Sequence, residues 1–498
     1  MNDNDSMAVK TESLSNNELL AEQWRTIDWQ TVELVVNRLQ IRIAKAVKQD
    51  NWNKIKRLQY LITHSFSAKL LAVKNVVTNK GKNTPGIDKV IWRTDSDKMK
   101  AALSLTDRRY KSKPLRRVYI EKKNKKSKRP LSIPCMYDRA MQALYTLALQ
   151  PIAETLADKH SYGFRKYRSC QDACEHIFTI FSRKYSPQWV LEGDIKGCFD
   201  NINHQWLIDN IPMDKSVLKQ FLKSGFVYKG ELFYTTSGTP QGGIISPILA
   251  NMALDGLQKK LAETFDISRT GRISERAHKR NKVNFVRYAD DFIVSAATKE
   301  IAEEVKIVIR DFLNIRGLQL SEEKTLVTNI NDGFDLLGWT FRKFKDKLII
   351  KPSRKSVKAL ITSLNDVILR QGKALSQDVL ICKLNQKLTG WGNYHKSVCS
   401  KTTFQKIDTI VFTLLWKWAC HRHTRKGRKW IKVKYWHTVN HRNWVFSTEN
   451  RELRSLSYIP ITRHPKLNLS ANPYFDQPYF LKRKVIKSLP EIGLPEIV

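Results

Sequence analysis

Two adjacent carboxylates stand between two hydrophobic runs in the middle of the chain. Asp290 and Asp291 lie where these runs predict two short strands, Asn284–Tyr288 and Asp291–Ser295, joined by a tight hairpin. Acidic side chains beside a core lose hydration, so the pair requires a neutralising group, and a divalent cation is the natural one. Two adjacent acids in a turn usually serve only as polar turn residues, so a third acid nearby is needed before the pair indicates a metal site.

Asp194 supplies the third acid, 96 residues before Asp290. It lies in a hydrophobic run, Gln188–Ile195, that predicts another strand, and Phe199 follows after a turn that contains glycine. Three carboxylates on adjacent strand ends form a hard oxygen site that suits Mg²⁺ and leaves positions open for phosphate oxygens. Two such ions about 3.5–4 Å apart can activate a 3′-hydroxyl and stabilise a leaving pyrophosphate, so the residues predict nucleotidyl transfer.

The chain that must position these residues carries a large excess of positive charge. Of its 498 residues, 87 are Lys or Arg and 47 are Asp or Glu, which gives a net charge of +40. This excess indicates a polyanionic partner, most commonly nucleic acid. We find no run of the ~20 apolar residues that cross a bilayer and no signal peptide, so we expect a cytoplasmic protein with no membrane partner. The seven cysteines are scattered, which predicts reduced, mostly buried thiols.

Two stretches concentrate the basic residues. Residues 108–129 hold twelve Lys or Arg and one acid, Glu121, in an alternating pattern that predicts a basic β-hairpin with its turn at 123–126. Residues 409–448 hold nine Lys or Arg, five tryptophans and no acid. Cations interleaved with flat rings suit a nucleic-acid backbone and unstacked bases, although we expect about half of the tryptophans to be core.

Apolar periodicity predicts the remaining elements. Near the N-terminus it predicts one helix over 32–47 and a second over roughly 52–76, followed by a shaped loop at 79–88. Phe334–Phe341 is predicted as a strand, and everything after Pro352 as helical. Within that helical part, residues 402–418 present one apolar face, as in a helix bundle.

Taken together, three motifs resemble the palm of a reverse transcriptase: Tyr288–Asp291, the spacing from Asp194 to Phe199, and Gly238–Pro247. Further runs resemble group II intron and non-LTR enzymes. These runs are Asn83–Asp88, Arg129–Pro134, Asp138–Gln142, Ser161–Arg165, Gly317–Thr325, Phe334–Trp339 and Gly390–His395, the last of which is similar to the maturase domain of bacterial group II intron proteins. The resemblance covers roughly residues 24 to 480.

The resemblance implies an α+β right-hand polymerase with fingers and palm, an α-helical thumb and a small basic C-terminal domain. We place a helical N-terminal extension at 1–95, fingers and palm at 96–345, the thumb or maturase domain at 346–425 and a basic DNA-binding-like domain at 426–498. Many relatives continue into an HNH-type endonuclease with paired cysteines. Because no such pair follows residue 445, we expect this chain to lack second-strand cleavage.

The same resemblance assigns roles to individual residues. The ring of Phe199 is expected to lie under the incoming sugar and reject a ribose 2′-hydroxyl, with core packing as the alternative. Gln241 is expected to contact the nascent base pair, and Lys324 to protonate the pyrophosphate unless it is only an exposed lysine. The predicted sets are Asp194, Ile195, Asp290 and Asp291 for metal; Asp194, Asp290, Asp291 and Lys324 for catalysis; Lys122, Arg129, Phe199 and Gln241 for nucleotide; and Arg425, Lys426, Arg428 and Lys429 for nucleic acid.

The implied function is RNA-directed DNA synthesis by a group II intron-encoded protein that also acts as a maturase and supports retromobility. The expected cofactor is Mg²⁺, two ions, with Mn²⁺ as a substitute. Expected partners are dNTPs, an RNA template with a DNA primer, intron RNA and target DNA. We expect the protein in the bacterial cytoplasm, associated with the nucleoid or a ribonucleoprotein. The oligomeric state stays open, with a dimer as one option.

Three other functions stay open. One is a domesticated reverse transcriptase of a retron, diversity-generating or CRISPR-linked system. Another is a splicing-only maturase with an inactive palm, against which the intact Asp194, Asp290 and Asp291 argue. The third is a plain RNA-binding scaffold, which would need neither these acids nor Phe199.

Overall fold

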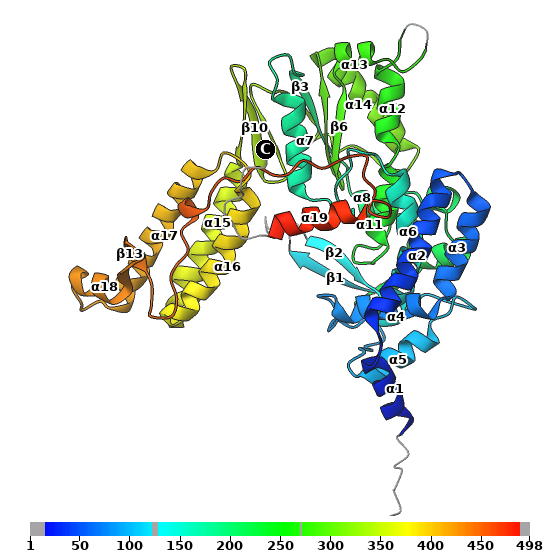
Figure 1. The fold of residues 1–498 in the computed structure, drawn as a ribbon, viewed down its shortest axis with the longest axis horizontal. Helices are drawn as coiled ribbons and strands as arrows, with labels where there is room; N and C mark the ends of the chain where they lie inside the picture. Colours follow the sequence, from blue (N-terminus) through cyan, green and yellow to red (C-terminus); the bar gives the residue numbers. More distant parts are fainter. Residues whose placement is uncertain (1–14, 122–127, 269–270, 489–498) are drawn as a thin grey trace, which may run out of the picture.

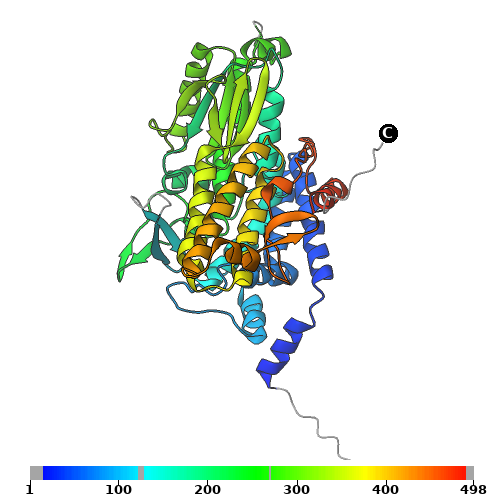
Figure 2. The same ribbon diagram turned by 90° about the vertical axis from the view of Figure 1, so that its left-hand side faces the viewer.

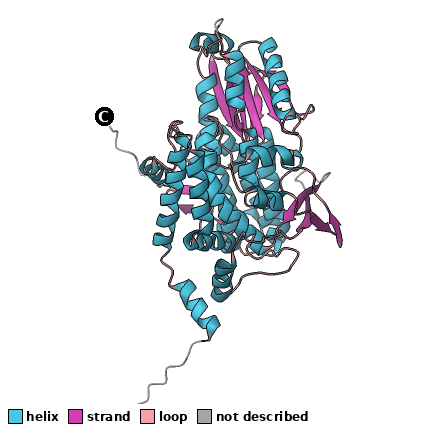
Figure 3. Ribbon diagram, turned by 90° about the vertical axis from the view of Figure 1, so that its right-hand side faces the viewer, coloured by secondary structure: helices cyan, strands magenta, loops and turns pink. Residues whose placement is uncertain are grey.

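The computed structural model describes residues 15–121, 128–268 and 271–488. A four-stranded antiparallel sheet of order β6-β7-β3-β8 forms one end of the molecule (Figure 1, Figure 3). Side chains alternate between its faces: Leu191 packs toward α14, whereas Val190 packs toward α7. The elements are β3 (Trp189–Asp194), β6 (Asn284–Tyr288), β7 (Asp291–Ala296), β8 (Leu326–Asn329), α7 (Cys170–Phe181) and α14 (Lys299–Asn314).

The strand predictions for this sheet are confirmed, but the prediction of one strand over Phe334–Phe341 is wrong. The backbone turns back at Leu337 and Gly338, which have φ of +50° and +85°. Residues with positive φ close a tight hairpin between two strands rather than continue one. The result is a second sheet of order β11-β10-β9, made of β9 (Phe334–Leu336), β10 (Trp339–Phe344) and β11 (Lys347–Pro352).

Helices of the N-terminal part pack around the long α6 in the largest core, which also takes in the α14 face of the sheet. The helix predicted over 32–47 is confirmed. The stretch predicted over 52–76 is two helices, because the chain is extended at Ser65, with φ −68° and ψ 129°. The helices are α1 (Asn16–Arg25), α2 (Trp29–Lys48), α3 (Trp52–His64), α4 (Phe66–Thr78), α5 (Asp95–Ser104) and α6 (Met136–Leu156).

A small sheet of order β2-β1-β4-β5 carries the predicted basic hairpin. Its two strands pair from Arg116 with Ile133 to Glu121 with Lys128, which confirms the hairpin; the turn predicted at 123–126 lies outside the described residues. Short helices connect this sheet to the central one. The elements are β1 (Leu115–Glu121), β2 (Lys128–Ile133), β4 (Phe226–Tyr228), β5 (Glu231–Phe233), α8 (Cys198–Asn201), α9 (His204–Asn210), α10 (Lys215–Leu222), α11 (Ser246–Leu254), α12 (Leu257–Phe265) and α13 (Glu275–Asn281).

Three long helices, the predicted thumb, stand in front of the rest in Figure 2 and enclose a core of their own. The prediction that everything after Pro352 is helical is wrong, because Asn440 and His441, both with positive φ, close a hairpin. The elements are α15 (Arg354–Asn365), a short π-helix (Asp366–Arg370), a 3₁₀ turn (Gln371–Ala374), α16 (Gln377–His395), α17 (Lys401–Arg422), α18 (Arg428–Tyr435), β12 (Trp436–Val439) and β13 (Arg442–Phe446).

The last part of the chain runs back from the thumb to the α7 side of the central sheet (Figure 1, Figure 2). After a 3₁₀ turn (Leu456–Tyr458) it reaches α19 (Gln477–Ser488). Phe480 joins a third core with α7 and β10, and Arg483 pairs with the buried Asp172. The thumb is therefore attached to the palm at both of its ends.

The α+β fold class is confirmed, and the four domain boundaries stay predictions. All seven cysteines are free, as predicted, but only Cys135, Cys174 and Cys198 are buried, so the expectation that most would be buried is wrong. Among the described residues, no helix is both long and apolar enough to cross a membrane.

Candidate active site and nucleic-acid interface

The predicted acids meet at one edge of the central sheet. Strands β6 and β7 pair as far as Tyr288 with Asp291, and the two residues between them, Ala289 and Asp290, form the turn. Strand β3 lies on the other side of β7 and places Asp194 directly opposite Asp291. The hairpin and the neighbouring strand thus bring together three carboxylates that are far apart in the sequence.

The carboxylates of Asp194, Asp290 and Asp291 lie close enough to repel one another. Burial raises the pKa of Asp291 to about 6, and the neighbouring charges of Asp290 and Asp194 act in the same direction. Carboxylates that are desolvated and mutually repelling fit a divalent cation. In the part of the chain that the structure describes, no group of three or more Asp, Glu, Cys or His side chains is arranged so that it could hold a metal ion.

Lys324, for which a role in protonating pyrophosphate is predicted, lies at this edge of the sheet. Its Nζ donates a hydrogen bond to Asp194 Oδ2 at 2.8 Å, and this bond raises the pKa of the lysine. The preceding backbone is fixed to the end of β3, because Ser321 N donates to Asp194 O at 2.8 Å. Ile195, the other predicted metal residue, has a buried side chain and forms an isolated bridge with Leu320.

Phe199 follows the end of β3 by five residues and lies beside the segment that carries Gln241, which is distant in the sequence. Thr239 N donates to Phe199 O at 2.6 Å, and Gln241 Nε2 donates to Asp200 Oδ2 at 3.0 Å. Gln241 O accepts from Ser132 N at 2.7 Å, which connects this segment to β2. A cavity of about 260 Å³ opens here. It is lined by Arg117, Pro130, Phe199, Asp200, Tyr234 and Gln241, among others.

The basic hairpin contributes a residue that the sequence did not single out. Predicted Arg129 is exposed on β2 opposite Ile120, and predicted Lys122 lies outside the described residues. Arg117 instead lines the cavity, with its guanidinium carbon 3.7 Å from the centre of the Phe226 ring. Its buried Nε has no hydrogen-bond partner among the residues that the structure describes. Twelve basic residues share the hairpin region, so charge alone gave no reason to choose Arg117.

Arg287, two residues before the turn of the β6–β7 hairpin, was not predicted from the sequence either. Its side chain is 1% exposed and donates to Asn251 Oδ1 at 3.1 Å, to Ala289 O at 3.4 Å and to Asp255 Oδ1. A buried guanidinium thus holds the backbone that carries Asp290. The one sign of this role in the sequence is an arginine inside an otherwise apolar strand. Its side-chain partners could not be identified from the sequence because they lie more than thirty residues away.

The predicted nucleic-acid residues lie elsewhere. All four are exposed: Arg425 and Lys426 lie between α17 and α18, and Arg428 and Lys429 begin α18, which Figure 1 shows at the far end of the thumb from β6. Of the five tryptophans nearby, Trp418 and Trp436 are buried, Trp416 is partly buried against the thumb core, and Trp430 and Trp444 are 38% and 50% exposed. The expectation that about half of the tryptophans are core is confirmed. His395 is buried where α16 meets Trp339 of β10.

Three family models match the chain. "N-terminal domain of reverse transcriptase" matches residues 24–105, "Reverse transcriptase (RNA-dependent DNA polymerase)" matches 120–341, and "Group II intron, maturase-specific domain" matches 357–436. Together these matches follow the resemblance inferred from the motifs, from the N-terminal helices to the thumb.

Individual relatives agree with the models. The chain is 34% identical over 398 residues to group II intron-encoded protein LtrA of Lactococcus lactis subsp. cremoris, covering 68% of this chain and 66% of LtrA. It is 29% identical over 366 residues to protein YkfC of Escherichia coli K12, covering 66% and 93%. It is 31% identical over 331 residues to an uncharacterized 91 kDa protein in the cob intron of Schizosaccharomyces pombe, covering 56% and 38%. The chain thus spans just under two thirds of LtrA.

Proposed function

This chain belongs to the group II intron-encoded reverse transcriptases that carry a maturase domain, and from that premise we propose that it copies RNA into DNA. The observation that carries the proposal is the sheet edge shared by Asp194, Asp290 and Asp291. Polymerases of this kind use divalent metal ions, which activate the attacking 3′-hydroxyl and stabilise the leaving pyrophosphate. We propose Mg²⁺, two ions, with Mn²⁺ as a substitute.

In this proposal the chain's own residues divide the work. Asp194, Asp290 and Asp291 hold the ions, with Ile195 beside them, and Lys324 delivers a proton to the departing pyrophosphate from its place on Asp194. The ring of Phe199 excludes a ribose 2′-hydroxyl, and Gln241 touches the nascent base pair from the wall of the same cavity. Lys122 and Arg129 hold the triphosphate, since basic side chains match phosphate oxygens.

Intron RNA is the second proposed partner. The match to the maturase-specific domain over 357–436 favours an intron-bound protein over a retron, diversity-generating or CRISPR-linked enzyme. The exposed Arg425, Lys426, Arg428 and Lys429 supply phosphate contacts to intron RNA or target DNA. With these partners the protein would splice and mobilise its intron, in the cytoplasm, as part of a ribonucleoprotein or near the nucleoid.

The test is primer extension on poly(rA)/oligo(dT) by the wild type and by the variant Asp194→Asn/Asp290→Asn, together with intron RNA binding. We expect the wild type to incorporate dTMP and the variant to incorporate none while it binds RNA as before. The physical reason is that both carboxylates hold the ions but neither contacts the RNA backbone. Retention of more than a few per cent of the activity would refute the metal assignment, and an inactive wild type would leave the maturase as the remaining function.

A further inference from the structure

Phe164 is a large apolar side chain that is 54% exposed beside the proposed active site. Its ring meets the ring of Phe199 edge-on, with centroids 6.2 Å apart and planes at 81°. This is the favoured geometry of an aromatic pair. The backbone of Phe164 has φ +58°, which a bulky side chain rarely adopts. Such a conformation persists only where the surroundings fix it, and it is concentrated at functional sites.

On one side, the loop that carries Phe164, Ser161–Arg165, is fixed to the catalytic turn. Tyr162 N donates to Arg287 O at 2.9 Å, and Asn251 Nδ2 donates to Gly163 O at 2.8 Å. Gly163 lies so close that a Cβ there would come within 2.3 Å of Ala289 N. The residue before Phe164 therefore lies against the backbone that presents Asp290.

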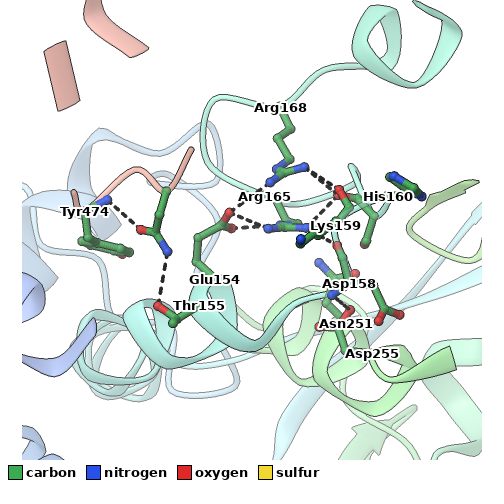
Figure 4. Close-up of polar contacts among 12 residues, drawn as sticks. Glu154, Thr155, Asp158, Lys159, His160, Arg165, Arg168, Asn251, Asp255 and Tyr474 are labelled. Atoms are coloured by element: carbon green, nitrogen blue, oxygen red, sulfur yellow. Dashed lines mark hydrogen bonds and ion pairs between the residues drawn. The ribbon is translucent and has the colours of Figure 1, made fainter. Parts of the chain in front are cut away.

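On the other side, the loop is fixed by a buried ion pair (Figure 4). Arg165 donates to both carboxylate oxygens of Glu154, at 2.9 and 2.6 Å, and its side chain is 6% exposed. The same guanidinium donates to Asp158 O at 2.6 Å and to Ser161 O at 2.9 Å, which closes the loop on itself. Phe164 thus stands between two fixed neighbours, and its backbone cannot shift without breaking the contacts of one of them.

The ring that Phe164 contacts is only partly buried. Phe199 lies on α8, a helix of only four residues that follows Gly197 in a left-handed conformation, and its half-buried side chain packs against the largest core. The part of the ring outside the core can still tilt unless a further neighbour holds it. The edge of Phe164 is placed to do so, from a loop that is also bound to the catalytic turn.

We propose that Phe164 is a positioning residue that braces the Phe199 ring, so that the site accepts deoxyribonucleoside triphosphates and rejects ribonucleoside triphosphates. The inference rests on the proposed polymerase function. Because the loop Ser161–Arg165 is also bonded to the strand before Asp290, the same contact would fix the distance between the Phe199 ring and the acids at the sheet edge. Loss of the brace leaves the acids in place but lets the Phe199 ring move off the 2′ position.

The experiment measures single-nucleotide incorporation of a dNTP and of the matching rNTP by the full chain. Phe164→Asn removes the ring, and asparagine tolerates positive φ, so the backbone of the loop is kept. Phe164→Leu keeps an apolar side chain without a ring and serves if the first variant melts early. We expect the rNTP/dNTP ratio to rise about two- to tenfold in both, the range expected when one aromatic pair is removed. Phe164→Tyr should match the wild type, as should Phe344→Asn, which removes an exposed ring from β10.

The same ratio measured in a Phe199→Ala background decides whether Phe164 acts through Phe199. Phe199→Ala should raise the ratio, and adding Phe164→Asn should change it no further. An unchanged ratio in Phe164→Asn and Phe164→Leu, full additivity in the double variant, or no effect of Phe199→Ala each overturns the brace while polymerisation stands. A wild type that incorporates no dNTP refutes the proposed function instead, so the two failures are distinct.

Discussion

At the edge of the central sheet, Asp194, Asp290 and Lys324 come from three separate parts of the chain and meet through strand pairing and a 2.8 Å hydrogen bond. The basic segment, Arg425–Lys429, spans five consecutive residues from the loop after α17 into the first turn of α18, and its side chains are exposed to solvent. The first region places a few acids with buried arginines behind them. The second presents many charges on an exposed surface.

The difference matches what each region would recognise in the proposed function. Metal ions and a reacting phosphate would demand donors placed to within about 0.5 Å, and buried supports such as Arg287 and Glu154 supply that rigidity. Binding a phosphate backbone demands charge density, because the favourable term is release of counterions rather than a fixed geometry. Substitutions at the sheet edge should therefore change the stability of the fold and the position of the acids. Substitutions in the basic segment should change RNA affinity according to the number of charges removed.

The largest effect is expected from Arg287→Met. This change leaves the carboxylate of Asp255 buried without its cation, and breaking a buried pair costs about 3–5 kcal/mol of the free energy of unfolding. dNTP incorporation should be lost with it, because the turn that carries Asp290 is no longer held. Urea denaturation and primer extension measure the two effects.

The matched control is Arg310→Met, which removes an exposed pair with Glu322 and should cost below about 1 kcal/mol. Arg287→Met/Asp255→Asn should recover part of the stability, since the second change removes the unpaired charge. If Arg287→Met is as stable and active as Arg310→Met, the buried arginines are not what distinguishes the sheet edge from the basic segment.

Local features of the fold could be predicted from the sequence. The strand Asn284–Tyr288 and the basic hairpin were predicted because alternation and charge are properties of neighbouring residues. The two strands β12 and β13 were not, because their turn uses Asn440 and His441 at positive φ instead of the Asn-Gly or Asp-Gly that announce such a turn. The break at Ser65 likewise lies inside an apolar pattern that continues across it.

Long-range supports could not be predicted in the same way. Arg165 and Arg287 find their acids 11 and 32 residues away, and nothing in a single sequence pairs them. The same holds for the contact of Phe164 with Phe199, which depends on where a loop and a four-residue helix meet. The sequence therefore predicts the acids of the proposed metal site better than the residues that hold them in place.

Removing charge from the basic segment should have the next largest effect. The variant Arg425→Ala/Lys426→Ala/Arg428→Ala/Lys429→Ala should bind intron RNA more weakly and with a smaller salt dependence. The logarithmic slope should fall by about 0.7–0.9 for each phosphate that the variant no longer neutralises. RNA titrations across a salt series measure it, and short-template extension at low salt should survive.

The control for this variant removes the same number of lysines and arginines from α12 and α13. Lys259, Lys260, Arg276 and Arg280 are exposed there, and their replacement by Ala should leave the salt slope as in the wild type. Equal weakening of RNA binding in the two quadruple variants would mean that net charge alone drives binding. A lower melting temperature together with equal weakening on RNA, duplex DNA and primer-template would mean that the basic segment supports the fold.

The smallest effect is expected from Trp430→Ala. The ring is 38% exposed, with the ammonium groups of Lys426 and Lys434 at 5.4 and 4.9 Å from its centre. Stacking of an unpaired base on it would contribute about 1 kcal/mol, or about fivefold in Kd, without counterion release. The Kd for intron RNA should therefore rise while the salt slope stays unchanged. Trp52→Ala, which removes a ring 39% exposed at the start of α3, should change neither quantity. A slope that falls in Trp430→Ala would show that the ring only orients the lysines, and the basic segment would then recognise RNA by charge alone.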